Sequence, residues 1–79
     1  MNIEVVCFGS LRDRLPDPRA GRAELQVGQD ATVGSVAAEL GIPEGAVFAC
    51  LLNGEQADLS HEVSDGDEVT LMPPFAGGR

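Results

Sequence analysis

A chain of 79 residues has room for one domain and one hydrophobic core, which leaves little space for a deep cleft lined with catalytic side chains. The hydrophobic fraction of 43%, with three phenylalanines and neither tryptophan nor tyrosine, predicts a globular core built mainly of aliphatic side chains. The formal net charge of -8 disfavours binding to nucleic acid or to a membrane surface, because both are themselves negatively charged. Such a charge suits docking on a basic protein patch, or it serves only to keep a small domain in solution.

The first third of the chain predicts a hairpin of two strands. Apolar residues alternate over residues 2–8, which predicts a strand with its odd-numbered side chains on one face. Residues 12–21 contain two prolines and a glycine and predict a loop. Alternation resumes over residues 22–27, and we expect this second strand to pair with the first.

One helix is predicted in the middle of the chain. Thr32 is a natural N-cap, and apolar residues follow it at helical spacing over residues 33–40. Gly41 stands where a C-cap glycine belongs, and Pro43 blocks continuation. We therefore expect a helix over residues 33–40 with one face packed on the sheet.

A second hairpin is predicted after the helix. Residues 47–52 are apolar enough to form a third strand that is buried on much of both faces. Asn53-Gly54 is the strongest two-residue hairpin turn in the sequence, because both positions tolerate positive φ. Residues 55–59 would then form a short fourth strand.

The last predicted strand completes the fold. A turn at residues 65–67 precedes a strand over residues 68–72, which Pro73-Pro74 ends by removing two backbone donors. The carboxylates of Asp65, Asp67 and Glu68 are expected to serve this turn rather than acid–base chemistry. The order strand, strand, helix, strand, short strand, strand predicts an α+β domain of the β-grasp type. It has a mixed sheet of four to five strands with one main helix across it, and its first and last strands are parallel neighbours.

The cysteines and the histidine predict no metal or catalytic centre. Cys7 and Cys50 lie far apart in apolar stretches, and neither has a second cysteine or a histidine at metal-ligand spacing. We expect two buried thiols in a reducing compartment. His61 lies in a polar stretch and is expected at the surface. No signal-peptide pattern and no apolar run of membrane-spanning length is present, so the sequence predicts a soluble, cytoplasmic protein.

Three stretches carry a family resemblance: VCFGSLRD at residues 6–13, DATVGSVAAEL at residues 30–40, and LLNGEQADLSHEVSDGDEVTLMPPFAGG at residues 51–78. The most specific part is DGDEV followed by an apolar strand, two prolines and a di-glycine. On these motifs the chain resembles the MoaD/ThiS-like sulfur carriers, which have a ubiquitin-like β-grasp fold. Its length and its two prolines are closer to MoaD, the small subunit of molybdopterin synthase, than to ThiS.

The resemblance implies that the C-terminal di-glycine, Gly77-Gly78, takes part in the reaction and supplies its catalytic positions. A ubiquitin-activating-type adenylating enzyme would use ATP to adenylate the Gly78 carboxylate, and a sulfur donor would then displace AMP and leave a thiocarboxylate. Two glycines suit this task because a backbone without Cβ atoms can enter a narrow channel. Residues 1–74 would form the domain and residues 75–79 a flexible tail. No permanently bound cofactor is expected, since ATP is used by the activating enzyme.

Members of the family usually end on the second glycine, whereas here Arg79 follows. Either a peptidase removes Arg79 before use, or Arg79 is an artificial extension, or this chain is not a carrier, and we favour the first two. The partners implied are the activating enzyme, the peptidase, and a larger MoaE-like catalytic subunit of molybdopterin synthase or another sulfur-accepting enzyme.

Three functions remain open at this stage. The first is a carrier that delivers sulfur to molybdopterin, or to thiamin, cysteine or another thio-metabolite. The second is a ubiquitin-like modifier that is joined through Gly78 to lysines of target proteins. The third is an interaction module with an inert tail.

Strand parity predicts a docking face. If the odd-numbered residues of the first strand face the helix, Val6 and Phe8 face outward, and Thr70 and Met72 of the last strand join them, with Phe75 following. An exposed patch of this kind on an acidic surface is a candidate docking site, although single exposed apolar residues are common. Arg12 would pair with acids of a partner or, as we favour, with the local Asp13 and Asp17. The predicted partner-binding residues are Phe8, Arg12, Met72, Pro73, Pro74, Phe75 and Ala76.

Overall fold

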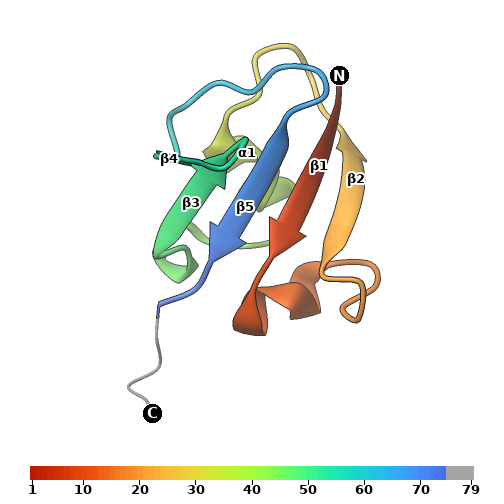
Figure 1. Ribbon diagram of the computed structural model, residues 1–79, viewed down its shortest axis with the longest axis vertical. Coiled ribbons are helices and arrows are strands. Elements are labelled where there is room, and N and C mark those ends of the chain that lie inside the picture. The colour runs from red at the N-terminus through yellow and green to blue at the C-terminus, as the bar shows by residue number, and fades with distance from the viewer. Residues whose placement is uncertain (75–79) are drawn as a thin grey trace.

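A computed structural model describes residues 1–74 of the chain as a five-stranded mixed sheet with one α-helix across it (Figure 1). The strand order is β2-β1-β5-β3-β4. The strands are β1 (Asn2–Cys7), β2 (Arg22–Gln26), β3 (Ala49–Leu52), β4 (Glu55–Ala57) and β5 (Glu68–Met72). The central strands β1 and β5 are parallel, and the other neighbours are antiparallel. The predicted order of elements and the predicted parallel pair are therefore confirmed, and the fold is a ubiquitin-like β-grasp.

The element bounds follow the predictions closely. Strand β5 has the predicted bounds, and the other four strands and the helix are each one or two residues shorter than predicted. The predictions for Phe75, Ala76, Gly77 and Gly78 lie outside the described residues.

The helix α1 (Val33–Glu39) is fixed at both ends by local contacts. The Thr32 hydroxyl accepts the Ser35 N–H at 3.2 Å, and the Ser35 hydroxyl accepts the Thr32 N–H at 2.8 Å. This reciprocal capping satisfies donors that the first turn leaves unpaired. Gly41 follows the helix with a φ of 75°, a left-handed conformation that favours glycine. The predicted cap and the predicted end of the helix are confirmed.

The turn of the second hairpin also has the predicted conformation. Asn53 has a φ of 54° and Gly54 a φ of 85°, and these positive values match the right-handed twist of the flanking strands β3 and β4. The Asn53 side chain further accepts the Glu68 N–H at 2.9 Å, which ties the hairpin to the start of β5.

Two 3-10 helices were not predicted. The first, η1 (Gly9–Arg14), follows β1 directly, so the prediction of a plain loop over residues 12–21 is wrong at its start. Leu11 is buried within η1, and Leu15 is buried just after it. Burial of these two side chains, rather than any helical period, holds the segment under the sheet. The second, η2 (Glu44–Ala46), precedes β3.

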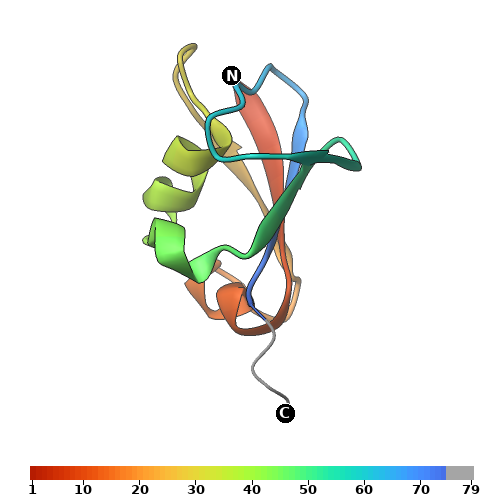
Figure 2. The same cartoon turned by 90° about the vertical axis from the view of Figure 1, so that its left-hand side faces the viewer.

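The core lies between α1 and one face of the sheet, and the described chain leaves the opposite face uncovered (Figure 2). The predicted inward parity is confirmed, because every odd-numbered residue of β1 is buried. The largest fully buried side chains are Ile3, Val5, Val33, Val36, Val69 and Leu71. Each contributes roughly 1.5–3 kcal/mol relative to full exposure. Within residues 1–74, no helix is long and apolar enough to cross a membrane.

Candidate functional site

The chain leaves the sheet at the end of β5, between two phenylalanines. Because β1 and β5 are parallel, with Cys7 opposite Leu71, both strands end at the same edge of the domain (Figure 1). The Phe8 N–H donates to the Leu71 carbonyl at 3.1 Å, and the Phe48 N–H donates to the Met72 carbonyl at 2.8 Å. These two bonds hold the last residues of β5 on both sides, so the departure point of the chain is a fixed part of the domain.

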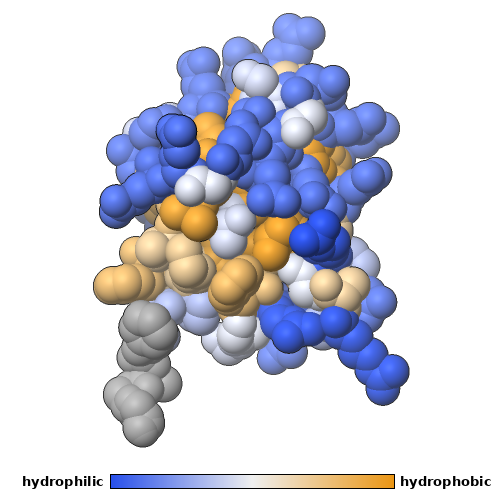
Figure 3. Space-filling view, in the orientation of Figure 1, coloured by the Kyte–Doolittle hydropathy of each residue, from blue (hydrophilic) through white to orange (hydrophobic). Residues whose placement is uncertain are grey.

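An apolar groove with a volume of about 710 Å³ lies at this departure point. It is lined by Phe8, Gly9, Ser10, Phe48, Ala49, Met72, Pro73 and Pro74, and we call it the exit groove. Among residues 1–74, Phe8 and Phe48 are the large hydrophobic side chains that are exposed, at 51% and 66%. Apolar residues gather on this face close to the end of the described chain (Figure 3). A contiguous exposed apolar surface of this kind is typical of a protein-binding site.

Gly9 sets the path of the chain as it leaves β5. Its φ is 58°, and a Cβ atom built on it would lie 3.0 Å from Cγ of Pro73. A side chain at position 9 would therefore be strained by its backbone conformation and would also displace the proline ring. The absence of a Cβ atom at this one position lets Pro73 pack directly against the segment that follows β1.

The structure brings together four of the predicted partner-binding residues. Phe8, Met72, Pro73 and Pro74 all line the exit groove. The predicted exposure of Thr70 is wrong, because this residue is only 7% exposed. It lies on the predicted outer face, but it is paired with Val6 on one side and Leu51 on the other, and the side chains of these neighbours cover it.

Phe48 belongs to the exit groove, and the sequence analysis missed it. It lies in the apolar run over residues 47–52, which predicted a strand buried on both faces. Strand β3 begins only at Ala49, and Phe48 lies beyond the end of the core. An apolar run does not show where the covering helix stops, so no signal in the sequence separated Phe48 from its buried neighbour Cys50.

Arg12 lies beside the exit groove and has a structural role. Its Nε donates to the Pro18 carbonyl at 2.9 Å, and its Nη2 donates to the Arg19 carbonyl at 2.7 Å. The favoured pairing with Asp13 and Asp17 is therefore wrong: the guanidinium fork matches two backbone carbonyls and holds the loop that leads to β2.

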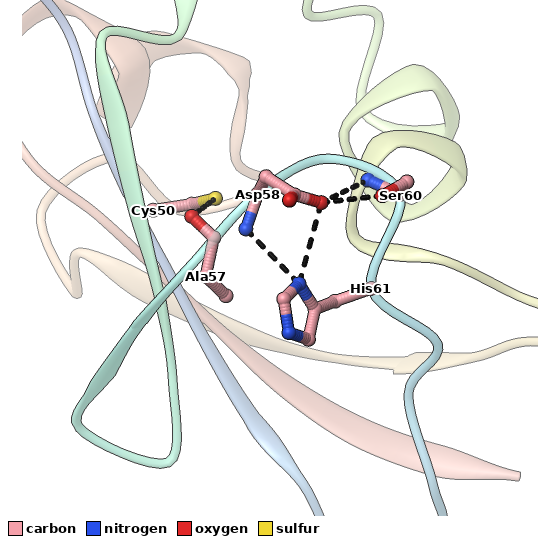
Figure 4. A network of polar contacts seen from close by, with 5 residues as sticks. All are labelled: Cys50, Ala57, Asp58, Ser60 and His61. Atoms are coloured by element: carbon pink, nitrogen blue, oxygen red, sulfur yellow. Dashed lines mark hydrogen bonds and ion pairs between the residues drawn. The ribbon is translucent and has the colours of Figure 1, made fainter.

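His61 lies at the surface, as predicted, in a hydrogen-bonded turn (Figure 4). The Asp58 carboxylate accepts hydrogen bonds from the hydroxyl and the backbone N–H of Ser60, and Nδ1 of His61 lies 3.3 Å from the same oxygen. These contacts lower the pKa of Asp58, and the hydrogen bond from the Ser60 hydroxyl has the largest effect. The Ser60 hydroxyl is bonded to Asp58 rather than to the imidazole, so this is no nucleophile–base pair. Carbonyls of the turn accept the N–H groups of Val33 and Gly34, and the turn thereby supports the start of α1.

Both cysteines are free and buried, as predicted. Burial raises the pKa of the Cys7 thiol. Burial, and then the charge of Asp58, raises the pKa of the Cys50 thiol, which lies 3.2 Å from the Ala57 carbonyl (Figure 4). A raised pKa disfavours the reactive thiolate. Over residues 1–74, no group of three or more histidine, cysteine or acidic residues could hold a metal ion.

The fold and the exit groove together define a β-grasp domain with an apolar groove at the point where its C-terminal segment departs. The chain belongs to the ThiS family, which matches residues 5–78. The predicted resemblance to MoaD/ThiS-like sulfur carriers is thereby confirmed. A search of curated proteins finds no match.

Three solved structures illustrate the range of similar proteins. SAMP1 from Haloferax volcanii is 30% identical, with 99% of this chain and 100% of that chain covered and a TM-score of 0.72. A chain of the complex of subunits 1 and 2 of molybdopterin-converting factor from Helicobacter pylori is 27% identical, with 99% and 100% covered and a TM-score of 0.61. A ubiquitin from Caldiarchaeum subterraneum is 26% identical, with 99% and 98% covered and a TM-score of 0.59.

Proposed function

We propose that this chain is a sulfur carrier whose Gly78 carboxylate is adenylated and then converted to a thiocarboxylate. The observation that carries the proposal is the exit groove, an apolar docking surface placed where the chain departs toward its di-glycine. A partner that docks on Phe8, Phe48 and Met72 is positioned to receive the segment that follows Pro74. Membership of the ThiS family supports the same reading.

We propose molybdopterin synthase as the destination of the sulfur, with this chain as its small subunit. The support is the similarity to a chain from the Helicobacter pylori complex of molybdopterin-converting factor, in which two subunits are assembled. The partners would be an adenylating enzyme that uses ATP and a larger, MoaE-like subunit that accepts the tail. Thiamin, cysteine and other thio-metabolites are alternative destinations. The use of ATP accords with the cytoplasmic location that the sequence predicts.

A second candidate is a protein modifier conjugated through Gly78. The similarity to SAMP1 from Haloferax volcanii, which is small archaeal modifier protein 1, favours this reading. Both functions begin with the same adenylation, and they differ in whether sulfur or a lysine amine of a target displaces AMP.

Intact mass spectrometry distinguishes the two functions. The chain ending at Gly78 should be incubated with the adenylating enzyme, ATP and a sulfur donor. A carrier gains the mass expected when one oxygen is replaced by sulfur, a modifier gives larger conjugates once target proteins are added, and an inert tail leaves the mass unchanged.

The chain ending at Arg79 provides the matched control, because its reacting carboxylate lies one residue further along. We expect pyrophosphate release only from the form ending at Gly78, and we propose that a peptidase removes Arg79 in the cell. Equal release from both forms would show that no trimming is needed.

A further inference from the structure

The charges of this domain are divided between two regions of the chain. Residues 12–22 carry Arg12, Arg14, Arg19 and Arg22 against two aspartates, so this segment is net positive. The remainder of residues 1–74 carries eleven acidic side chains and neither arginine nor lysine. A protein with a formal net charge of -8 thus has one basic region, and its position in the fold is informative.

The basic segment lies at the end of the domain from which the chain departs. It comprises the second half of η1, the loop that leads to β2 and the first residue of β2, and it therefore follows the C-terminal end of β1 (Figure 1). The opposite end of β1 is acidic: the Asn2 N–H donates to the Asp65 carboxylate at 2.7 Å, and Asp67 lies in the same turn. The basic segment therefore lies at the exit end, and η2, which carries the exposed Glu44, lies at the same end.

Two of the four arginines are already used inside the domain. Arg12 holds the carbonyls of Pro18 and Arg19, as described above. Arg22 pairs with the Glu4 carboxylate at 3.0 Å. The hydrogen bonds of Arg12 fix the loop that carries Arg19, and the ion pair of Arg22 holds the end of that loop against β1.

The other two arginines, Arg14 and Arg19, are exposed, and within residues 1–74 neither forms an ion pair. Both belong to the segment that connects β1 to β2, on the β1 side of the exit groove. Arg14 lines a hollow that also contains Asp13 and Ser10, and Ser10 is a residue of the groove. The loop after Arg19 lines a second hollow of about 410 Å³, which shares Phe8 with the groove.

We propose that Arg14 and Arg19 form a cationic rim along the β1 side of the exit groove, and that this rim receives acidic side chains beside the tail-accepting mouth of a partner protein. The partner would present an apolar surface to the groove and aspartate or glutamate residues beside it, facing the β1–β2 connection. This inference rests on the proposed function, since it concerns the enzyme that takes up the tail.

Charge complementarity supports the choice of an acidic protein surface. The acidic remainder of the domain repels such a surface, while the exit end attracts it, so the encounter is oriented with the tail toward the mouth. The same acidic remainder disfavours nucleic acid as the ligand of the rim. Exposed charges act over a screening length of about 8 Å at physiological ionic strength, so the effect should disappear in high salt.

The test uses the adenylating enzyme from the same genome and compares two double variants with equal net charge. Arg14→Gln/Arg19→Gln removes the rim charges, and Gln29→Glu/Gln56→Glu makes the same change of net charge at exposed positions away from the exit groove. Stopped-flow association rates should be measured at low and at high salt, with pyrophosphate release as a second readout. We expect the rim variant to associate roughly 5- to 10-fold more slowly at low salt, with little difference at high salt. The control should change the rate by less than about twofold.

The two readouts separate the possible failures. If the wild-type chain supports pyrophosphate release but the rim variant associates as fast as the control or faster, the cationic rim is refuted and the proposed function stands. If the wild-type chain supports no release, the proposed function fails, and the rim proposal fails with it.

Discussion

Gly9 and Pro73 are in contact across the end of the sheet, so close that a Cβ atom at position 9 would lie 3.0 Å from Cγ of Pro73. The contact joins the second residue after β1 to the first residue after β5, and the φ of 58° at Gly9 makes it possible. The direction in which the chain leaves the domain therefore depends on one backbone position that lies far away in the sequence.

Gly9→Ala should impair the proposed carrier function more than it impairs stability. The positive φ costs an alanine about 1–3 kcal/mol of strain, and the methyl group also pushes Pro73 out of place. Gly54→Ala is the matched control, because Gly54 has a φ of 85° and open space around it. Both variants should lose similar stability in urea unfolding, but only Gly9→Ala should slow adenylation of the tail. Equal adenylation rates for the two would show that the Gly9–Pro73 contact does not set the path of the chain.

The exit groove should lose partner affinity when its aromatic rings are removed. Phe8→Ala and Phe48→Ala should each weaken binding to the adenylating enzyme or to the larger subunit by about 2 kcal/mol, as is typical of aromatic anchors at an interface. Because both rings are more than half exposed in the free domain, the melting temperature should change little. Isothermal titration calorimetry measures the affinity, and exposed Gln56→Ala serves as the control. Unchanged affinity in both phenylalanine variants would place the docking site elsewhere.

The sequence predicted which face each strand presents, but not what covers that face. Alternation placed Val5 and Val69 in the core correctly, because period two follows directly from strand geometry. The same argument failed for Thr70, which is covered by side chains of neighbouring strands in the sheet. Burial there depends on pairing register, and register joins segments that are far apart in the sequence.

Only part of the exit groove was predicted, because some of its contacts also join segments that the sequence pattern does not relate. Phe8 and Met72 were found because the period of the first predicted strand extends to Phe8 and that of the last strand to Met72. Phe48 lies just before its strand, and Arg12 finds its partners in a loop whose carbonyl directions no residue pattern specifies. Contacts of this kind depend on backbone conformation, so they require the structure.

The turn around Asp58 should make stability depend on pH in the acidic range. Hydrogen bonds from Ser60 lower the pKa of Asp58 in the folded state, so the unfolded state binds the proton more readily. The stabilising contribution is therefore present above the ordinary aspartate pKa of about 3.9 and is lost as the pH falls through the lowered value. Urea unfolding at pH 5 and pH 3 should show a loss of stability that is smaller in Asp58→Asn. If the pH dependence of Asp58→Asn equals that of wild type while exposed Asp30→Asn reduces it, the contribution has been assigned to the wrong carboxylate.

Gly77→Ala should leave the free energy of unfolding unchanged and slow sulfur transfer. Gly77 lies outside the described residues, so this prediction rests on the sequence: a methyl group added next to the reacting residue Gly78 should clash where the backbone passes through a narrow channel of the activating enzyme. A displacement of about 1 Å at a reacting group can reduce the rate roughly 100-fold. Gly28→Ala is the matched control, because a Cβ atom at that position meets open space. Sulfur transfer should be followed by mass spectrometry in a reconstituted system, with thermal unfolding measured alongside. A wild-type transfer rate for Gly77→Ala would mean that the tail acts as a carboxylate on a generic linker, without any requirement for close backbone approach.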